Sequence, residues 1–212
     1  EKQRLDDELR IARDIQKSLL PVEPPRVAGV TFADLCEPAR EVGGDYYDFF
    51  PLGPGRLGVL IADVAGKGTS AALYMAELKG LIMALSQTYQ SPRQLLIEAN
   101  RLLCDNLDSR SFITMTYAVI DLVNGIMTYA RAGHCPLIYL PGPAAAIQGA
   151  QVLVPSGMVL GLRIDGAVTK FNDLLEEVQI PLHTGDVLVF YTEGSTEAMN
   201  ADSDLFGDAR LS

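Results

Sequence analysis

The chain has 212 residues, of which 48% are hydrophobic, and its formal net charge at pH 7 is −10. That length suffices for one complete hydrophobic core, while no apolar run reaches the roughly 18 residues of a membrane span. We therefore expect a cytoplasmic protein without a membrane contact. The excess of acidic residues also disfavours nucleic acid as a partner, and three cysteines without CxxC spacing disfavour a disulfide framework or a zinc site.

Residues 2–20 are predicted to form a helix that ends before Pro21. Its residues at 4-3-4-3 spacing form a short a/d seam, and two further isoleucines extend this apolar stripe over nearly half of the helix surface. One interpretation is a terminal helix packed on its own domain. The other is a coiled-coil-like linker, formed by residues 1–20, that contacts a partner helix in a homodimer. Residues 21–212 are then expected to form one domain. The seam and the two isoleucines are Leu5, Leu9, Ala12, Gln16 and Leu19, with Ile11 and Ile15.

A hairpin is predicted around the turn Leu52–Gly55, which separates two runs rich in aromatic and β-branched residues. A turn centred near Pro54 places Asp45 directly opposite Asp63 on a largely apolar face. Like charges opposed across a strand pair are destabilising. A shared proton, a nearby Lys or Arg, or a bound cation would each offset this repulsion, and the hairpin alone leaves the three open.

The remaining elements indicate an α+β protein. A short strand over 31–36 precedes the hairpin, and two helices follow it, one capped by Thr69 or Ser70 and one opening at Ser91. This order lacks the strand–helix alternation of a parallel sheet, so we expect antiparallel sheets covered by helices. The later strands are predicted over 112–121, 126–133, 136–140, 168–180 and 186–192.

A third acid, Glu193, follows the strand predicted over 186–192, and alternation places it on that strand's apolar face. Asp45, Asp63 and Glu193 thus each end an apolar strand face near glycines. One such acid is more often a turn residue, but three in the same context favour an oxygen-ligand site for Mg²⁺ or Mn²⁺. Lys67, between two glycines at a helix entrance, is the candidate for substrate-phosphate binding, against the alternative of a solvated loop lysine.

Other catalytic motifs are not completed by this sequence. The segment GKGTS lacks the upstream glycine of a phosphate-binding loop, because that position is Ile61. His134 and Cys135 are adjacent, so as strand neighbours they point to opposite faces and make a poor base–nucleophile pair. His134 is expected to be a structural histidine in a turn, and it is only a weak candidate for a general acid.

Several motifs occur in the order and spacing of a known family: GGDYYDFF, IADVAGKGTSAALYMA, FITMTYAVID, RAGHCPLIYL, GMVLGL and GDVLVFYTEGSTEAMN. Through them, residues 21–212 resemble the bacterial SpoIIE/RsbU branch of the PPM metal-dependent protein phosphatases. The resemblance implies a type 2C phosphatase-like α/β/β/α sandwich, in which two packed antiparallel β-sheets are flanked by helices. It also implies two Mn²⁺ or Mg²⁺ ions, and hydrolysis of phosphoserine or phosphothreonine on a regulatory partner such as a STAS-type anti-anti-sigma protein.

The same resemblance assigns the catalytic and metal-binding residues. Asp63 is expected to bridge both metals, with the Val64 carbonyl as a further ligand, and Asp45 to bind metal or its water. Glu193 stands where the family has the Asp of YTDG. The family continues into a final strand with another acidic ligand, so the resemblance implies that the second metal site is incomplete here. These departures give the alternative function, a non-catalytic phosphatase-like binding module in a signalling pathway.

Overall fold

The computed structural model describes residues 2–38, 41–66, 68–143, 149–200 and 203–211. Two antiparallel sheets form its centre, a larger one in the order β1-β2-β3-β4-β7 and a smaller one in the order β6-β5-β8. The expected α+β fold with two antiparallel sheets is therefore confirmed. The strands are β1 Asp45–Pro51, β2 Arg56–Val64, β3 Ile113–Asp121, β4 Ile126–Ala132, β5 Leu137–Leu140, β6 Gln151–Leu153, β7 Glu177–Pro181 and β8 Val187–Val189.

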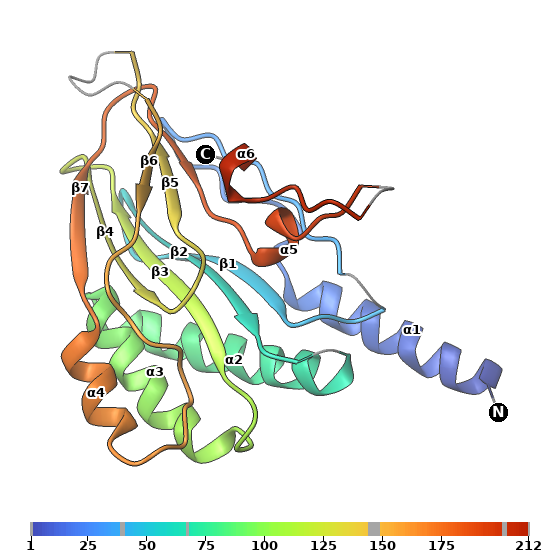
Figure 1. Ribbon diagram of the computed structural model, residues 1–212. Coiled ribbons are helices and arrows are strands. Elements are labelled where there is room, and N and C mark those ends of the chain that lie inside the picture. Colours follow the sequence, from blue (N-terminus) through green and yellow to red (C-terminus); the bar gives the residue numbers. More distant parts are fainter. Residues whose placement is uncertain (1, 39–40, 67, 144–148, 201–202, 212) are drawn as a thin grey trace.

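Helices cover one side of this arrangement. In Figure 1, α2, α3 and α4 lie together beneath the larger sheet, whereas α1 extends away from it toward the N-terminus. Among the described residues, no helix combines the length and apolar character needed to cross a bilayer. The helices are α1 Lys2–Leu19, α2 Thr69–Thr88, α3 Pro92–Asn106, α4 Ala167–Leu174, α5 Glu193–Thr196 and α6 Asp208–Leu211.

Two hydrophobic clusters occupy the two faces of the larger sheet. One packs α2 and α3 against sheet residues that include Leu60 and Tyr117. The other fills the space between the sheets and includes Val59 and Leu137. Because side chains alternate along a strand, Asp63 projects from the same face of β2 as Val59. The acidic end of the hairpin thus opens toward the smaller sheet.

The two central helices begin in different ways. Ser91 caps α3 as predicted, since its hydroxyl accepts a hydrogen bond from the Gln94 N–H at 3.2 Å and Pro92 follows it. The predicted cap of α2 is wrong, because Thr69 and Ser70 both lie inside the helix and the N-cap is Gly68 without a side-chain bond. Gly68 has φ 80, which a glycine adopts readily, so the chain enters the helix one residue earlier.

Three predicted strands differ from the structure. The segment 31–36 forms no strand, although Phe32 packs against the cluster between the sheets. The segment 168–180 divides into α4 and β7, because Ala167 and Phe171 are buried four residues apart, a helical spacing. Strand β8 ends at Val189, so Glu193 begins α5 and does not continue the strand alternation.

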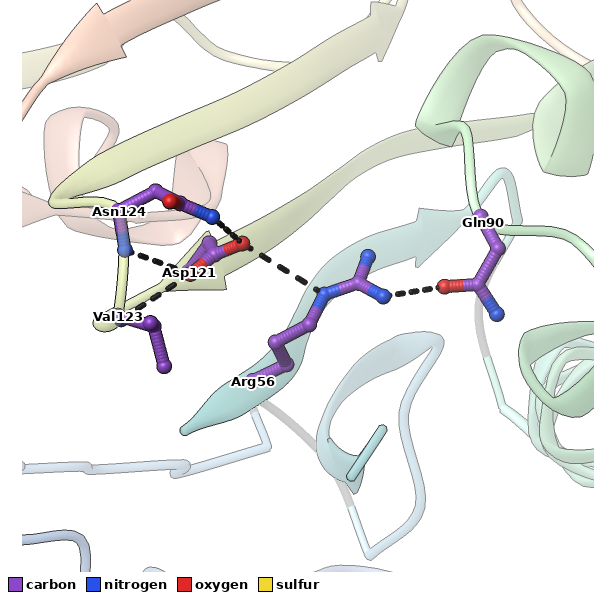
Figure 2. Close-up of polar contacts among 5 residues, drawn as sticks. All are labelled: Arg56, Gln90, Asp121, Val123 and Asn124. Carbon is purple, nitrogen blue, oxygen red and sulfur yellow. Dashed lines mark hydrogen bonds and ion pairs between the residues drawn. The ribbon is translucent and has the colours of Figure 1, made fainter. Parts of the chain in front are cut away.

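Opposite charges meet at the turn end of the larger sheet. Arg56 lies opposite Asp121 in the β2–β3 ladder, with its Nε 3.9 Å from Asp121 Oδ2. Asp121 also accepts hydrogen bonds from the N–H groups of Val123 and Asn124 and from the Asn124 side chain (Figure 2). The second side of Arg56 donates to Gln90, which follows α2. Every charge drawn at this end has a partner.

One buried ion pair joins the larger sheet to α2. Lys79 Nζ lies 2.7 Å from Asp48 Oδ2, and the Tyr46 hydroxyl donates to the same oxygen at 2.7 Å. Asp48 is buried, and the ammonium group also lies over the Tyr46 ring. A buried carboxylate with both a cation and a hydrogen-bond donor is compensated. This pair therefore fixes α2 against β1, the strand that begins with Asp45.

Candidate metal centre

The predicted cross-strand acid pair is present. Asp45 and Asp63 are direct partners in the β1–β2 ladder, as the turn at Pro54 indicated. Both side chains are partly buried. In the described part of the chain, none of the ion pairs involves either of them. Of the three ways to offset their repulsion, a nearby Lys or Arg is therefore not found among the described residues.

The electrostatic environment raises the pKa of both carboxyl groups. Burial is the largest cause of the rise in the Asp63 pKa to about 6, followed by the negative charges of Asp45, Glu193 and Glu197. Burial also raises the pKa of Asp45, and a hydrogen bond from the Thr192 side chain partly offsets that rise. A site that raises carboxyl pKa values by burial and like charge favours either a proton or a metal cation.

Glu193, which is exposed, approaches Asp63 from the end of the smaller sheet. It follows β8 as the first residue of α5, and its charge acts on Asp63. Thr192, just before it, contacts Asp45. Glu197 is one helical turn later, where its N–H bonds to the Glu193 carbonyl at 2.8 Å. The sequence interpretation missed Glu197, although its spacing of four residues from Glu193 indicates a shared helix face.

Gly44 explains how the backbone approaches this site. A Cβ atom at position 44 would collide with the Val64 carbonyl oxygen and lie 3.1 Å from Asp63 Oδ1. The Val64 N–H also donates to the Gly44 carbonyl at 3.3 Å. Only a glycine leaves the Val64 carbonyl and the Asp63 carboxylate free of a neighbouring side chain. This is the approach that a ligand at these oxygens requires.

The donor set fits a hard divalent cation. Asp45, Asp63, Glu193 and Val64 offer only oxygen atoms, the ligands that Mg²⁺ and Mn²⁺ prefer. No three His, Cys, Asp or Glu side chains of the described residues lie close enough to hold one ion between them. Mg²⁺ commonly binds through one or two carboxylates and keeps several waters, so the acid pair and its neighbours suffice. Lys67, the predicted phosphate-binding residue, lies outside the described residues.

His134 is a buried structural residue, as expected. Its side chain is buried, and its Nδ1 lies 2.8 Å from the Thr114 hydroxyl. Burial is the main cause that lowers the His134 pKa to about 4. The imidazole is therefore neutral at pH 7 and lacks the acidic proton of an imidazolium, so the weak general-acid assignment finds no support.

Helix α1 contacts the site through a glutamine. The Gln16 side chain donates to the Gly43 carbonyl at 2.6 Å and accepts from the Gly43 N–H at 3.1 Å. Gly43 lies two residues before Asp45, and a small cavity beside it is lined by Gln16, Cys36 and Asp45 among others. A shift of α1 would thus move the backbone that leads into the acid pair.

Residues 53–212 match the family model of stage II sporulation protein E (SpoIIE). Phosphoserine phosphatase RsbU of Bacillus subtilis (strain 168) is 33% identical over 195 residues, which are 92% of this chain and 55% of that protein. This chain therefore spans about half the length of that relative. The range that matches the SpoIIE model includes Asp63, Val64 and Glu193, whereas Asp45 precedes it.

Solved structures share the fold. The SiaA-PP2C domain of Pseudomonas aeruginosa has a TM-score of 0.78 at 20% identity, covering 99% of this chain and 80% of that one. RsbX in complex with magnesium has a TM-score of 0.53 at 15% identity, covering 70% and 65%. At these identities the likeness establishes a PP2C-like fold.

Proposed function

The chain belongs to the SpoIIE family, and we propose that it is a divalent-metal-dependent phosphatase for phosphoserine or phosphothreonine on a protein. The observation that carries this proposal is the pair of Asp45 and Asp63, opposed across two strands with raised pKa values. Such a pair costs stability without a cation, and a cation at this place can meet a phosphate. The relative RsbU, named a phosphoserine phosphatase, supports the choice of substrate.

The residues of the chain would act mainly by holding charge in place. Asp63, the Val64 carbonyl, Asp45 and Glu193 would hold Mn²⁺ or Mg²⁺, and Thr192 orients Asp45 by its hydrogen bond. Bound divalent ions would neutralise phosphoryl oxygens and make water a better nucleophile at neutral pH. Without ions, the acidic side chains repel a phosphate dianion, so substrate binding itself depends on the cation.

The described residues offer no activated protein nucleophile at this site. The thiol of Cys36 lies close enough to Asp45 to be affected by its charge, and burial together with that charge raises the Cys36 pKa to about 11. It therefore stays a thiol, which is a weak nucleophile. Direct attack of water on phosphorus is consequently the reaction class that we propose. Lys67, which precedes α2 in the sequence, is proposed to contact the substrate phosphate.

The proposed partner is a phosphorylated regulatory protein of the STAS anti-anti-sigma type. The alternative is a binding module that recognises such a partner without hydrolysis. One observation favours the alternative: no three described acidic side chains lie close enough to share one ion. The opposed acids at Asp45 and Asp63 favour catalysis, because a binding module has no need to retain their repulsion.

The test is phosphate release from a serine-phosphorylated STAS protein, with and without Mn²⁺. We expect release that requires Mn²⁺, ends on chelation and is absent in Asp63→Asn. Glu98→Gln, which makes the same chemical change on α3 where Glu98 pairs with Arg101, is the matched control and should retain wild-type release. Binding of the phosphorylated partner without any release would establish the binding module instead.

We further propose that residues 1–20 form a linker helix and that α1 joins two copies of the chain. Ile11 and Ile15 are 57% and 58% exposed on α1, whereas Gln16 on its other side is buried against Gly43. The helix thus has an apolar stripe that its own domain leaves uncovered. Sedimentation of the wild type should reveal a dimer that Ile15→Glu dissociates. A monomeric wild type would refute this arrangement.

A further inference from the structure

His134 lies where the chain passes from one sheet to the other. It follows β4 of the larger sheet by two residues and precedes β5 of the smaller sheet by three. Its neighbour Gly133 has φ 65 and forms a bridge to Met115, so the passage begins beside β3. His134 is 4% exposed. A polar ring so deeply buried needs partners on the elements that enclose it.

One partner leads to the acid on the larger sheet. His134 Nδ1 lies 2.8 Å from Thr114 Oγ1. Thr114 is the ladder partner of Asp63, and its hydroxyl lies 3.5 Å from the Asp63 carbonyl oxygen. The contact between His134 and Thr114 therefore helps to fix the backbone position of Asp63.

The other partner leads to the acid beyond the smaller sheet. The ring interacts with the backbone of Tyr191, two residues before Glu193. Within the described chain, this contact falls short of standard hydrogen-bond geometry at Nε2, which is buried. The backbone of His134 is held separately, because the Arg131 guanidinium donates to the carbonyl oxygens of His134 and Pro155. The hydrogen bond with Thr114 therefore fixes the Nδ1 side of the ring, next to the strand that carries Asp63.

We propose that His134 is a positioning residue that, through Thr114, holds the backbone of Asp63 in the place that divalent-cation binding needs. This inference rests on the proposed function, since it assigns a structural cause to the arrangement of the same site. A neutral imidazole suits the role, because it holds Thr114 without adding charge beside the acids. Residues that orient metal ligands without binding the metal typically change affinity by about 10- to 100-fold when replaced.

Calorimetric titration of Mn²⁺ into the chain, without substrate, tests the proposal. We expect His134→Leu and Thr114→Val each to weaken Mn²⁺ binding by about tenfold. The double variant should bind no more weakly than the weaker single variant, because both changes remove the same contact. His134→Asn, whose amide can reach Thr114, should recover most of the affinity.

Asp186→Ala is the matched control. Asp186 also joins separate segments with a buried side chain, accepting hydrogen bonds from Gly142, Tyr139 and His183, but it lies before β8, at the end away from Glu193. Its removal should lower the Tm and leave Mn²⁺ affinity within about twofold. If Asp186→Ala weakens Mn²⁺ binding as much as His134→Leu, the loss reflects general destabilisation and the proposal is overturned.

The outcomes separate this inference from the proposed function. Equal Mn²⁺ affinity in wild type, His134→Leu and Thr114→Val would overturn the positioning role while leaving the phosphatase proposal intact. Weakened binding in those variants, in a protein that releases no phosphate, would support the positioning role and overturn the phosphatase proposal. Should His134→Leu fail to fold, Thr114→Val, which removes only the hydroxyl contact, decides the question.

Discussion

The two ends of strand β2 differ in charge: the pair at its first end lies in the ladder with β3, and the pair at its last end lies in the ladder with β1. At the first end, Arg56 lies opposite Asp121, and each has further hydrogen-bond partners. At the last end, Asp63 lies opposite Asp45; burial raises the pKa of both, and neighbouring negative charges raise that of Asp63 further. The first end stabilises the fold. The last end costs stability in the absence of a cation, which is the reason for proposing that its residues serve metal binding and catalysis.

Substitutions at the two ends of β2 should differ in their effects: one should reduce activity, and the other should reduce stability. We expect Asp63→Asn to lower phosphate release by at least about 100-fold, as removal of a group that supports transition-state charge does. Asp121→Ala should leave release within about twofold and lower the Tm by about 2–4 °C, because the turn loses its hydrogen bonds. Phosphate release and thermal unfolding of both variants measure this. Similar losses of phosphate release in both variants would contradict the assignment of a structural role to Asp121 and a catalytic role to Asp63.

The pH dependence of stability sharpens the comparison. In the metal-free protein, the Asp63 pKa is raised to about 6 from its model-compound value of 3.8. The folded state therefore holds this proton more tightly, and the resulting stability is full below about pH 4 and lost as pH rises through about 6. Solvent screening limits the effect, since Asp63 is only partly buried.

Thermal unfolding of metal-free wild type and Asp63→Asn from pH 4 to pH 7 checks this. The Tm of Asp63→Asn minus that of wild type should grow by about 2–4 °C between pH 4.5 and pH 7. Carboxyl groups with lowered pKa values, such as Asp186, affect both proteins equally and cancel in the difference. A difference that is constant over this range would mean that Asp63 titrates normally in the folded chain.

The smallest expected effect is at Glu193. Shortening it to Asp gives the residue of the related YTDG motif, and α5 keeps its place at the end of the smaller sheet. We expect Glu193→Asp to preserve phosphate release or raise it by up to about tenfold, the lower end of what one methylene contributes in a binding site. Steady-state kinetics at several Mn²⁺ concentrations measure it. Loss of metal binding in this variant would show that Glu193 does not occupy the position of the Asp in the YTDG motif.

The sequence predicts the acid pair well because the signal is local. The turn at Pro54 sets the register of the hairpin, and a fixed register determines which residues oppose each other. Asp45 and Asp63 follow directly from it. The family motifs then supply the arrangement of two antiparallel sheets, which local patterns alone leave as one of several α+β folds.

Other parts of the site depend on contacts that no local pattern contains. Glu197 acts on Asp63 only because α5 begins at Glu193, where strand alternation was expected to continue. The sequence predicts His134 as a turn residue. Its contact with Thr114 exists because the segment between β4 and β5 brings it next to β3. The segment 168–180 is predicted as one strand for a related reason. Its first part forms α4, which buries Phe171, and only its last part forms β7.

Thermal unfolding of wild type and Asp63→Asn, each with and without saturating Mn²⁺, tests the central claim most directly. At pH 7 without metal, Asp63→Asn should unfold about 2–4 °C above wild type, because one of two opposed charges is gone. With Mn²⁺ at about one hundred times its dissociation constant, the wild-type Tm should rise by about 5–10 °C and the variant should change little. A wild type that Mn²⁺ does not stabilise, or an equal rise in both proteins, would contradict the claim that the acid end of β2 is built to hold a divalent cation.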